Sequence, residues 1–357
     1  MAQYPGTEAE QKIQAGPLAD WVSVVFTGCG MSNDDATLLA QSLIDSDLRG
    51  IHSHGIIRVP DYVEKLTTGG VNPQGKPKQV GGRGAVTVID GGNSMGQIGA
   101  TFAMRQAIEL AAIHGLGAAA LRGSNHCGAM DRYAMMALPH DMIGIATTNA
   151  LPTMAPWGGA QKIVGINPIG VAMPALEEEP FVLDTAFGAT AHGKIRVYEQ
   201  KGHPLPPGWA LDADGRPTTD PGEALVGMIS PIGEFKGVGL AMMSGMLSSL
   251  LSGAAYGLES GNMEDGAIAG VDGQFFLALD IAAFGEPEHF KRRVDGIVRE
   301  VHSARRAQSA QPLLMPGEME ADFARRYRHE GIPLNPETLQ GLSDAGLRVA
   351  VPLPADW

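Results

Sequence analysis

A short polar segment near the start of the chain contains residue types that suit hydride chemistry on a carbonyl group. His52-Ser53-His54-Gly55 is followed, three positions on, by Arg58. Reduction of a ketone needs a proton donor for the forming alkoxide, which a histidine can be near neutral pH. A neighbouring hydroxyl can orient that imidazole, and an arginine can hold a substrate carboxylate through two N–H groups. A loop of ordinary polar residues followed by a solvated helix charge has the same composition, so the segment alone leaves both interpretations open.

A second segment, Gly123-Ser124-Asn125-His126-Cys127-Gly128-Ala129-Met130, follows an expected strand and opens an expected helix. Small residues in such a position leave backbone N–H groups free to approach a phosphate. His126 is then a second acid/base group or a cofactor contact. A helix cap with a structural histidine would give the same pattern.

Three further segments could line a site. Asp184-Thr185-Ala186 ends a strand, where α/β proteins commonly place a polar group, and His192-Gly193-Lys194 follows shortly after. Phe235-Lys236 opens an apolar helix, whose first backbone N–H groups can face an anion. Met315-Pro316-Gly317-Glu318 forms a turn before a helix. An ordinary turn between two elements would explain each of these segments as well.

The glycines of Thr27-Gly28-Cys29-Gly30-Met31 do not make a dinucleotide fingerprint. That motif needs a preceding strand and a third glycine three residues on, but position 33 is Asn and the preceding segment is typical of a helix. We therefore interpret the segment as a helix-terminating turn. A nucleotide, if one binds, must be held in another way.

Composition narrows the function classes. The net charge of −13 makes nucleic acid and anionic membranes poor partners. Two cysteines, Cys29 and Cys127, suit a reducing cytoplasm, and residues 1–20 do not have the pattern of a secretory signal. Residues 237–258 carry no charge, but their serines and glycines favour a buried helix over a membrane span.

Hydrophobic periodicity predicts the elements that must position these residues. A helix begins at Ser32, capped with Asp35, and ends near Gly50; a second covers about 58–68 and stops at Gly69-Gly70. Residues 71–84 are typical of a linker. Strands are expected at 85–90, 117–121, 143–148, 181–184 and 275–279, and helices at 100–114, 132–138, 238–256 and over much of 288–346.

The expected architecture is α/β (α+β), with a mixed sheet flanked by helical segments from both chain ends. We divide it into an N-terminal helical segment (1–75) that carries the histidine loop, an α/β core (76–285), and a helical C-terminal segment (286–357) that packs with the N-terminal part.

Seven stretches, taken in order, resemble the malate/L-lactate dehydrogenase family. They are DLRGIHSHGIIRVPDY, GSNHCGA, GINPIGVAMP, HGKI, GHPLPPGWALDADGRPTTDP, EFKGVGLAM and MPGE, and they span about Asp47 to Glu318. The ordered set is far more specific than any one stretch. The resemblance implies a non-Rossmann NAD(P)-binding core and a homodimer or larger assembly.

The resemblance also implies roles for individual residues. His54 corresponds to the family's proton donor and Ser53 to the residue that relays charge to it, while Arg58 corresponds to the carboxylate clamp. His126 matches a position used for acid/base catalysis in some members and for cofactor contact in others. We expect the substrate pocket to include Arg58, Tyr62, His192, Gly193 and Lys194. Cofactor binding is expected from His126, Cys127, Gly128, Ala129, Met130, Asp184, Thr185, Ala186, Phe235, Lys236, Met315, Pro316, Gly317 and Glu318.

Two positions depart from subsets of the family. The family usually has Thr before Asn-Pro, where this chain has Ile166, so one polar substrate contact is lost. Imino-acid reductases of the family carry Asp where this chain has Lys194, which favours a 2-oxo or 2-hydroxy acid over a cyclic imine.

The sequence therefore predicts a cytoplasmic NAD(P)-dependent oxidoreductase that interconverts a small anionic 2-oxo acid and its 2-hydroxy acid, with NAD preferred to NADP and no metal, nucleic acid or membrane partner. One alternative is a metal-dependent hydrolase in which His52 and His54 act with His126, Asp184 and His192 as zinc ligands. A non-catalytic protein of the same fold is another.

Overall fold

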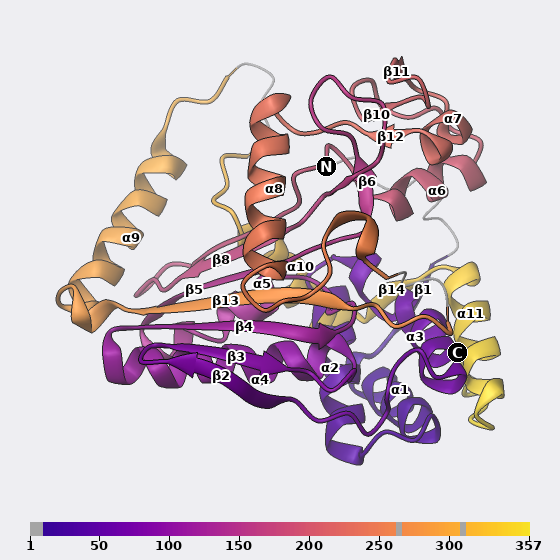
Figure 1. Cartoon of the computed structure of the whole chain (residues 1–357), viewed down its shortest axis with the longest axis horizontal. Coiled ribbons are helices and arrows are strands. Elements are labelled where there is room, and N and C mark those ends of the chain that lie inside the picture. The colour runs from indigo at the N-terminus through magenta and orange to yellow at the C-terminus, as the bar shows by residue number, and fades with distance from the viewer. Residues whose placement is uncertain (1–9, 262–265, 308–311) are drawn as a thin grey trace.

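A seven-stranded mixed sheet forms the centre of the computed structural model, which describes residues 10–261, 266–307 and 312–357 (Figure 1). Among these residues β3 and β4 are the one parallel pair in the sheet, and the remaining neighbours are antiparallel. The predicted mixed α/β fold is thus confirmed. In spatial order the strands are β2 (Lys78–Arg83), β3 (Val86–Asp90), β4 (Leu116–Ser124), β13 (Asp272–Asp280), β5 (Met142–Thr148), β8 (Ile169–Met173) and β9 (Phe181–Thr185).

Helices cover both faces of this sheet. α4 (Gly96–His114) packs on one face through alanines, and Ala146 of β5 belongs to the same buried cluster. The next residue of β5, Thr147, points to the opposite face. There its hydroxyl forms a 2.7 Å hydrogen bond with Ser248 of α8 (Phe235–Ser249). Gly144 lets α5 (Asp131–Met135) approach closely, because a Cβ there would lie 2.0 Å from the carbonyl oxygen of Ala134.

A helical layer at one end of the sheet draws on both ends of the chain. Its single apolar cluster joins Leu18, Leu39 and Tyr62 with Ile332 and Leu342. An antiparallel pair of short strands, one from each end of the chain, ties the layer together. The elements involved are β1 (Gln11–Ile13), α1 (Ala15–Gly28), α2 (Asn33–Leu48), α3 (Val59–Thr68), β14 (Ile332–Leu334) and α11 (Pro336–Arg348).

Two other helices follow the sheet in sequence. α10 (Glu318–Glu330) packs against α2. α9 (Pro287–Ser303) lies apart from the helical layer (Figure 1), and its Asp295 accepts backbone N–H groups of Leu176, Glu177 and Glu178. The division of the chain at residues 75 and 285 stays a prediction.

A smaller lobe carries the predicted substrate segment His192–Lys194. Its apolar cluster includes Met154, Phe187, Ile195 and Leu205. The elements of the lobe are β6 (Pro152–Met154), β7 (Val164–Gly165), α6 (His192–Gln200), β10 (Ala210–Leu211), β11 (Pro217–Thr218), α7 (Pro221–Val226) and β12 (Met228–Ile229).

Local capping and turn signals predicted several boundaries correctly. The Asp35 N–H donates to Ser32 Oγ (3.3 Å), and the Ser32 hydroxyl donates to the Asp35 carboxylate (2.8 Å). Helix α3 stops at Gly69, whose φ of 91° suits glycine. α1 ends at Gly28, as expected for a helix-terminating turn.

Other expectations were wrong. The supposed linker 71–84 contains the edge strand β2, whose residues are all exposed and therefore lack an apolar pattern. β8 was not predicted, and α8 ends at Ser249 rather than near 256, because Gly253 turns the chain at φ 78°. No helix in the described part of the chain has the length and hydropathy to cross a membrane.

Candidate active site

A buried carboxylate fixes the turn that carries the predicted acid/base histidine. Between α2 and α3 the chain forms two short 3₁₀ turns, His52–His54 and Ile56–Arg58. Asp47, which is 1% exposed, accepts the Ile56 N–H at 2.7 Å and pairs with His52 Nδ1 at 2.8 Å. A Cβ at Gly55 would lie 2.2 Å from this carboxylate, so glycine is required there. Desolvation raises the pKa of Asp47, and the contacts with His52 and Ile56 oppose that shift.

Ser53 connects the two side chains predicted to act on the substrate. Its Oγ lies 2.9 Å from His54 Nδ1, and its carbonyl oxygen accepts a hydrogen bond from Arg58 Nε at 2.7 Å. Arg58 Nη1 also donates to Asp61 at 3.1 Å. The imidazole and the guanidinium therefore share one support and are held in a fixed relation to each other.

A second histidine faces the first. The rings of His54 and His126 are stacked, with centroids 5.5 Å apart and planes 16° apart. Gln97 Nε2 donates to Tyr62 Oη (3.0 Å), so the Tyr62 hydroxyl can donate its own proton to His126 Nδ1, 2.6 Å away. The structure thus brings four of the predicted residues together: Ser53, His54, Tyr62 and His126.

Electrostatics keep both imidazoles neutral near neutral pH. Desolvation, helped by the Arg58 charge, lowers the pKa of His54 to about 4. Desolvation, His54 and Arg58 together lower the pKa of His126 well below its usual value. Both side chains still keep part of their surface open to solvent. A neutral imidazole with an open edge can accept a proton from a bound hydroxyl group.

The predicted carboxylate clamp lies beside the start of α6. A Cβ at Gly193 would be 3.5 Å from Arg58 Nη2, so the glycine leaves that edge of the guanidinium approachable. A cavity of about 130 Å³ touches Ser53, Arg58 and Gly193. Lys194 Nζ lies 4.8 Å from the Trp209 ring centroid, and desolvation lowers its pKa. His192 occupies the first position of the same helix.

The departure at Ile166 is accommodated by packing. The Ile166 side chain packs closely on Gly188, because a Cβ added at Gly188 would lie 2.7 Å from Ile166 Cγ2. The Ile166 carbonyl oxygen accepts a hydrogen bond from the Phe187 N–H. The side chain packs against the apolar cluster of the smaller lobe. An apolar group is therefore well placed there, and it brings no polar contact to a ligand.

Three of the four predicted cofactor segments meet near the start of α5. Desolvation and the Asp131 charge raise the pKa of Asp184, and the nearby backbone N–H groups of Asp131 and Met130 oppose that rise. Gly317 packs on Val182, whose N–H donates to the Pro316 oxygen at 3.0 Å. Segments 126–130, 184–186 and 315–318 are thus neighbours. Phe235 and Lys236 lie exposed at the start of α8, which packs on the sheet face opposite α4 and α5.

The phosphate contact expected from residues 123–130 stays a prediction. We expected the backbone N–H groups of Gly123–Met130 to be free for a phosphate. The Met130 N–H at the end of that segment, like the N–H of Asp131 beyond it, lies near the Asp184 carboxylate and lowers its pKa. The helix that follows, α5, has only five residues.

The residues proposed for the alternative zinc site have separate partners. His52 pairs with Asp47, whereas His54 contacts Ser53 and His126. In the described ranges no group of three or more His, Cys, Asp or Glu side chains is arranged to hold a metal ion. The hydrolase alternative would need both histidines of the His-Ser-His motif on one ion.

Sequence reasoning missed two residues of this site. Asp47 supports the turn from the preceding helix, and Gln97 orients Tyr62 from the first turn of α4. Asp47 was noted only as the start of a resembling stretch. Gln97 has no local signal, because its contact joins segments 35 positions apart.

Comparison with known proteins agrees with this geometry. The family model for malate/L-lactate dehydrogenase matches residues 13–343. The L-sulfolactate dehydrogenase of Methanocaldococcus jannaschii is 40% identical over 291 residues, covering 82% of this chain and 84% of that protein. The malate dehydrogenase of Pyrococcus abyssi is 34% identical over 350 residues, covering 95% of each.

A solved structure of the sulfolactate dehydrogenase from Methanocaldococcus jannaschii matches with a TM-score of 0.89 at 35% identity, covering 95% of this chain and 98% of that one. Residues 13–343, which the family model matches, include the histidine turn, the sheet and the three neighbouring segments. The chain therefore belongs to the malate/L-lactate dehydrogenase family, a family of hydroxy-acid oxidoreductases.

Proposed function

We propose that this protein interconverts a small 2-oxo acid and its 2-hydroxy acid with a nicotinamide cofactor. The observation that carries the proposal is the shared support of His54 and Arg58 by Ser53, with His126 stacked on the other side of His54. This arrangement offers one acid/base group and one carboxylate clamp at a fixed separation. A 2-hydroxy acid has a matching hydroxyl and carboxylate on adjacent carbons.

The residues present fit a nicotinamide cofactor, which would supply or accept the hydride. Asp184 is an exposed residue near the end of β9, beside segments 126–130 and 315–318, and its carboxylate oxygens can accept hydrogen bonds from ribose hydroxyl groups. The groups that would hold the cofactor are the three neighbouring segments His126–Met130, Asp184–Ala186 and Met315–Glu318.

In the oxidation direction, His54 acts as the base. When Nδ1 carries the proton and donates it to Ser53 Oγ, the lone pair of Nε2 is free to accept the proton of the substrate hydroxyl. In the reduction direction the protonated Nε2 returns that proton to the forming alkoxide. Arg58 holds the carboxylate throughout, with Nη2 facing Gly193.

The substrate is proposed to be a small acid rather than a cyclic imine. Lys194 follows Gly193 directly, and its ammonium group is held against Trp209. The Arg58 guanidinium beside Gly193 favours an anionic substrate and disfavours a positively charged iminium group. Relatives named malate and sulfolactate dehydrogenase are consistent with substrates of this class.

We also propose that the protein forms a homodimer. One side of α8 exposes several large apolar residues to solvent, which is uncommon for a helix of a monomer. They are Phe235, Leu240, Met243 and Met246, followed by Leu250 and Leu251.

His54→Gln should remove most turnover. Glutamine cannot exchange a proton, so kcat should fall by roughly 10²- to 10⁴-fold while cofactor affinity changes little. Steady-state kinetics with a panel of 2-oxo acids, followed by cofactor absorbance, measure the first effect and calorimetry the second. The exposed His114→Gln is the control, and near-normal turnover of His54→Gln would remove His54 from the acid/base role.

The pH profile should show the lowered pKa of His54. Neutral His54 is the required form for oxidation, so kcat/KM for oxidation should stay level from neutral pH down to about pH 5 and decline towards pH 4. Reduction needs the protonated form, so its rate should fall as pH rises. Circular dichroism at each pH checks that the protein stays folded. A break near the ordinary histidine pKa of about 6.5 would contradict the buried environment of the acting group.

Arg58→Lys should chiefly weaken substrate binding. Lysine keeps the charge but loses the two-pronged donor geometry, so KM should rise about tenfold or more. The matched control is Arg292→Lys, because Arg292 pairs with Glu288 on the exposed side of α9. If KM for the oxo acid did not change, Arg58 would not be the carboxylate clamp.

Light scattering after size-exclusion chromatography should give twice the mass of the chain. Leu250→Glu places a charge in the exposed apolar side of α8 and should shift the protein towards the monomer mass. Leu347→Glu, at an exposed leucine of α11, is the control. A wild-type monomer at micromolar concentration would reject the dimer.

A further inference from the structure

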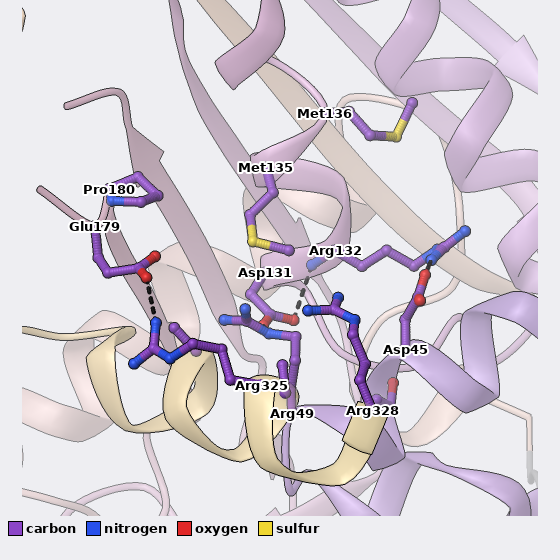
Figure 2. A pocket seen from close by; sticks show the side chains of 13 residues that line it. Asp45, Arg49, Asp131, Arg132, Met135, Met136, Glu179, Pro180, Arg325 and Arg328 are labelled. Atoms are coloured by element: carbon purple, nitrogen blue, oxygen red, sulfur yellow. Dashed lines mark hydrogen bonds and ion pairs between the residues drawn. The ribbon is translucent and has the colours of Figure 1, made fainter. Parts of the chain in front are cut away.

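A second, larger cavity lies behind the predicted cofactor segments and is lined by four arginines (Figure 2). It has a volume of about 550 Å³. We call it the arginine pocket and define it by Arg49, Arg132, Arg325 and Arg328. Arg49 follows the end of α2, Arg132 belongs to α5, and the other two come from α10. None of these arginines was singled out by the sequence motifs.

Three of the four guanidinium groups are paired with carboxylates. Arg49 Nε lies 2.8 Å from Asp131, Arg132 pairs with Asp45, and Arg325 pairs with Glu179. Arg328 forms no ion pair within the described ranges (Figure 2). Arg325 also lies 3.6 Å from Asp322, which does not line the pocket, so within the described ranges Arg328 is the arginine of the pocket whose charge has no carboxylate partner.

Two guanidinium nitrogens of the pocket also lack hydrogen-bond acceptors. Arg49 Nη2 and Arg132 Nε are buried from solvent and have no partner among the described residues. A buried N–H without an acceptor costs free energy, so a ligand that supplies acceptor oxygens would be favoured there. The carboxylates already present do not meet this need, whereas an anion with several oxygens can.

Besides the arginines, Ser46 and the three carboxylates, the wall has an apolar part. Met135 and Pro180 line one part of the pocket, and Ala321 and Ala324 line the part formed by α10. Methionine sulfur and small side chains pack well against aromatic faces. An apolar wall beside arginines is the chemistry that recognises a phosphorylated nucleoside.

The pocket is lined by residues that lie close in sequence to the three neighbouring cofactor segments. Asp131 follows Met130, Pro180 precedes β9 with its Asp184, and α10 begins at Glu318. A dinucleotide with its reactive ring near His54 and His126 and its riboses near Asp184 would have its far end at this pocket.

We propose that the arginine pocket binds the phosphate on the adenosine ribose of NADP, so that the protein prefers NADP to NAD. The proposal rests on the proposed function and reverses the preference for NAD that the sequence suggested. The phosphate brings negative charge and several acceptor oxygens to Arg328 and to the unpaired N–H groups of Arg49 and Arg132. The 2′-hydroxyl of NAD brings neither.

Binding of NADP⁺ and NAD⁺ to the full-length chain, measured by titration calorimetry without substrate, tests the proposal. Wild type should bind NADP⁺ on the order of tenfold or more tighter than NAD⁺. Arg328→Ala should lose most of that ratio while leaving NAD⁺ affinity unchanged, and Arg328→Lys should keep part of it. Adenosine 2′,5′-bisphosphate should likewise bind tighter than 5′-AMP to wild type but not to Arg328→Ala.

Arg326→Ala is the matched control. Arg326 lies two positions away on the same helix and is exposed, but its guanidinium stacks on Phe323 and Tyr327 and does not line the pocket. Its removal changes the net charge by the same amount as Arg328→Ala and should leave the ratio of NADP⁺ affinity to NAD⁺ affinity unchanged. A loss of the ratio in Arg326→Ala as well would reduce the effect to general electrostatics and overturn the proposal.

The other outcomes separate this proposal from the function on which it rests. If wild type binds both dinucleotides equally, or if Arg328→Ala keeps the wild-type ratio, the pocket is not the phosphate site and the dehydrogenase function still stands. If wild type binds neither dinucleotide, the proposed function fails and this proposal fails with it. Unchanged NAD⁺ affinity in Arg328→Ala shows that the variant is folded.

Discussion

The buried carboxylate of Asp47 is the constraint on which the candidate site depends. It lies at the end of α2, where the chain must leave a helix and form two tight turns without a regular hydrogen-bond ladder. By accepting the Ile56 N–H and pairing with His52, it replaces the backbone partners that those turns lack. Glycine is the only residue type that fits at position 55, because a Cβ there would collide with the Asp47 carboxylate. The positions of Ser53, His54 and Arg58 all follow from this one anchored corner.

The site also shows how burial tunes reactive groups. His54 and His126 stack on each other, and Arg58 is close to both, so each imidazole meets a low-dielectric surrounding and a nearby positive charge. Both effects favour the neutral ring. A bound substrate carboxylate would offset the Arg58 charge and make protonation of His54 easier when the acid is in place. The clamp would thereby help to match the proton affinity of His54 to the reaction.

Sequence reasoning reached the parts of this structure that depend on neighbours in the chain. The Ser32 cap, the stop at Gly69 and the pairing of Ser53 with His54 all join residues within a few positions. The ordered stretches located His126, Tyr62 and the segment near Gly317. The features that sequence reasoning did not predict depend on residues far apart in the chain or have no recognisable sequence pattern. Gln97 reaches Tyr62 from α4, and β2 is an exposed edge strand of glycines and polar residues. The arginine pocket draws on α2, α5 and α10, which no local motif connects.

The position of β13 has a consequence for how the chain is made. This strand lies in the middle of the sheet, between β4 and β5, yet it is the last of the seven to be synthesised. Until it leaves the ribosome, β4 and β5 each have an unpaired edge, and unpaired edges attract other chains. The helical layer must wait longer still, because β1 has no partner until β14 follows. The central sheet can therefore be completed only after residue 280 has been synthesised, and the pairing of β1 only after residue 334.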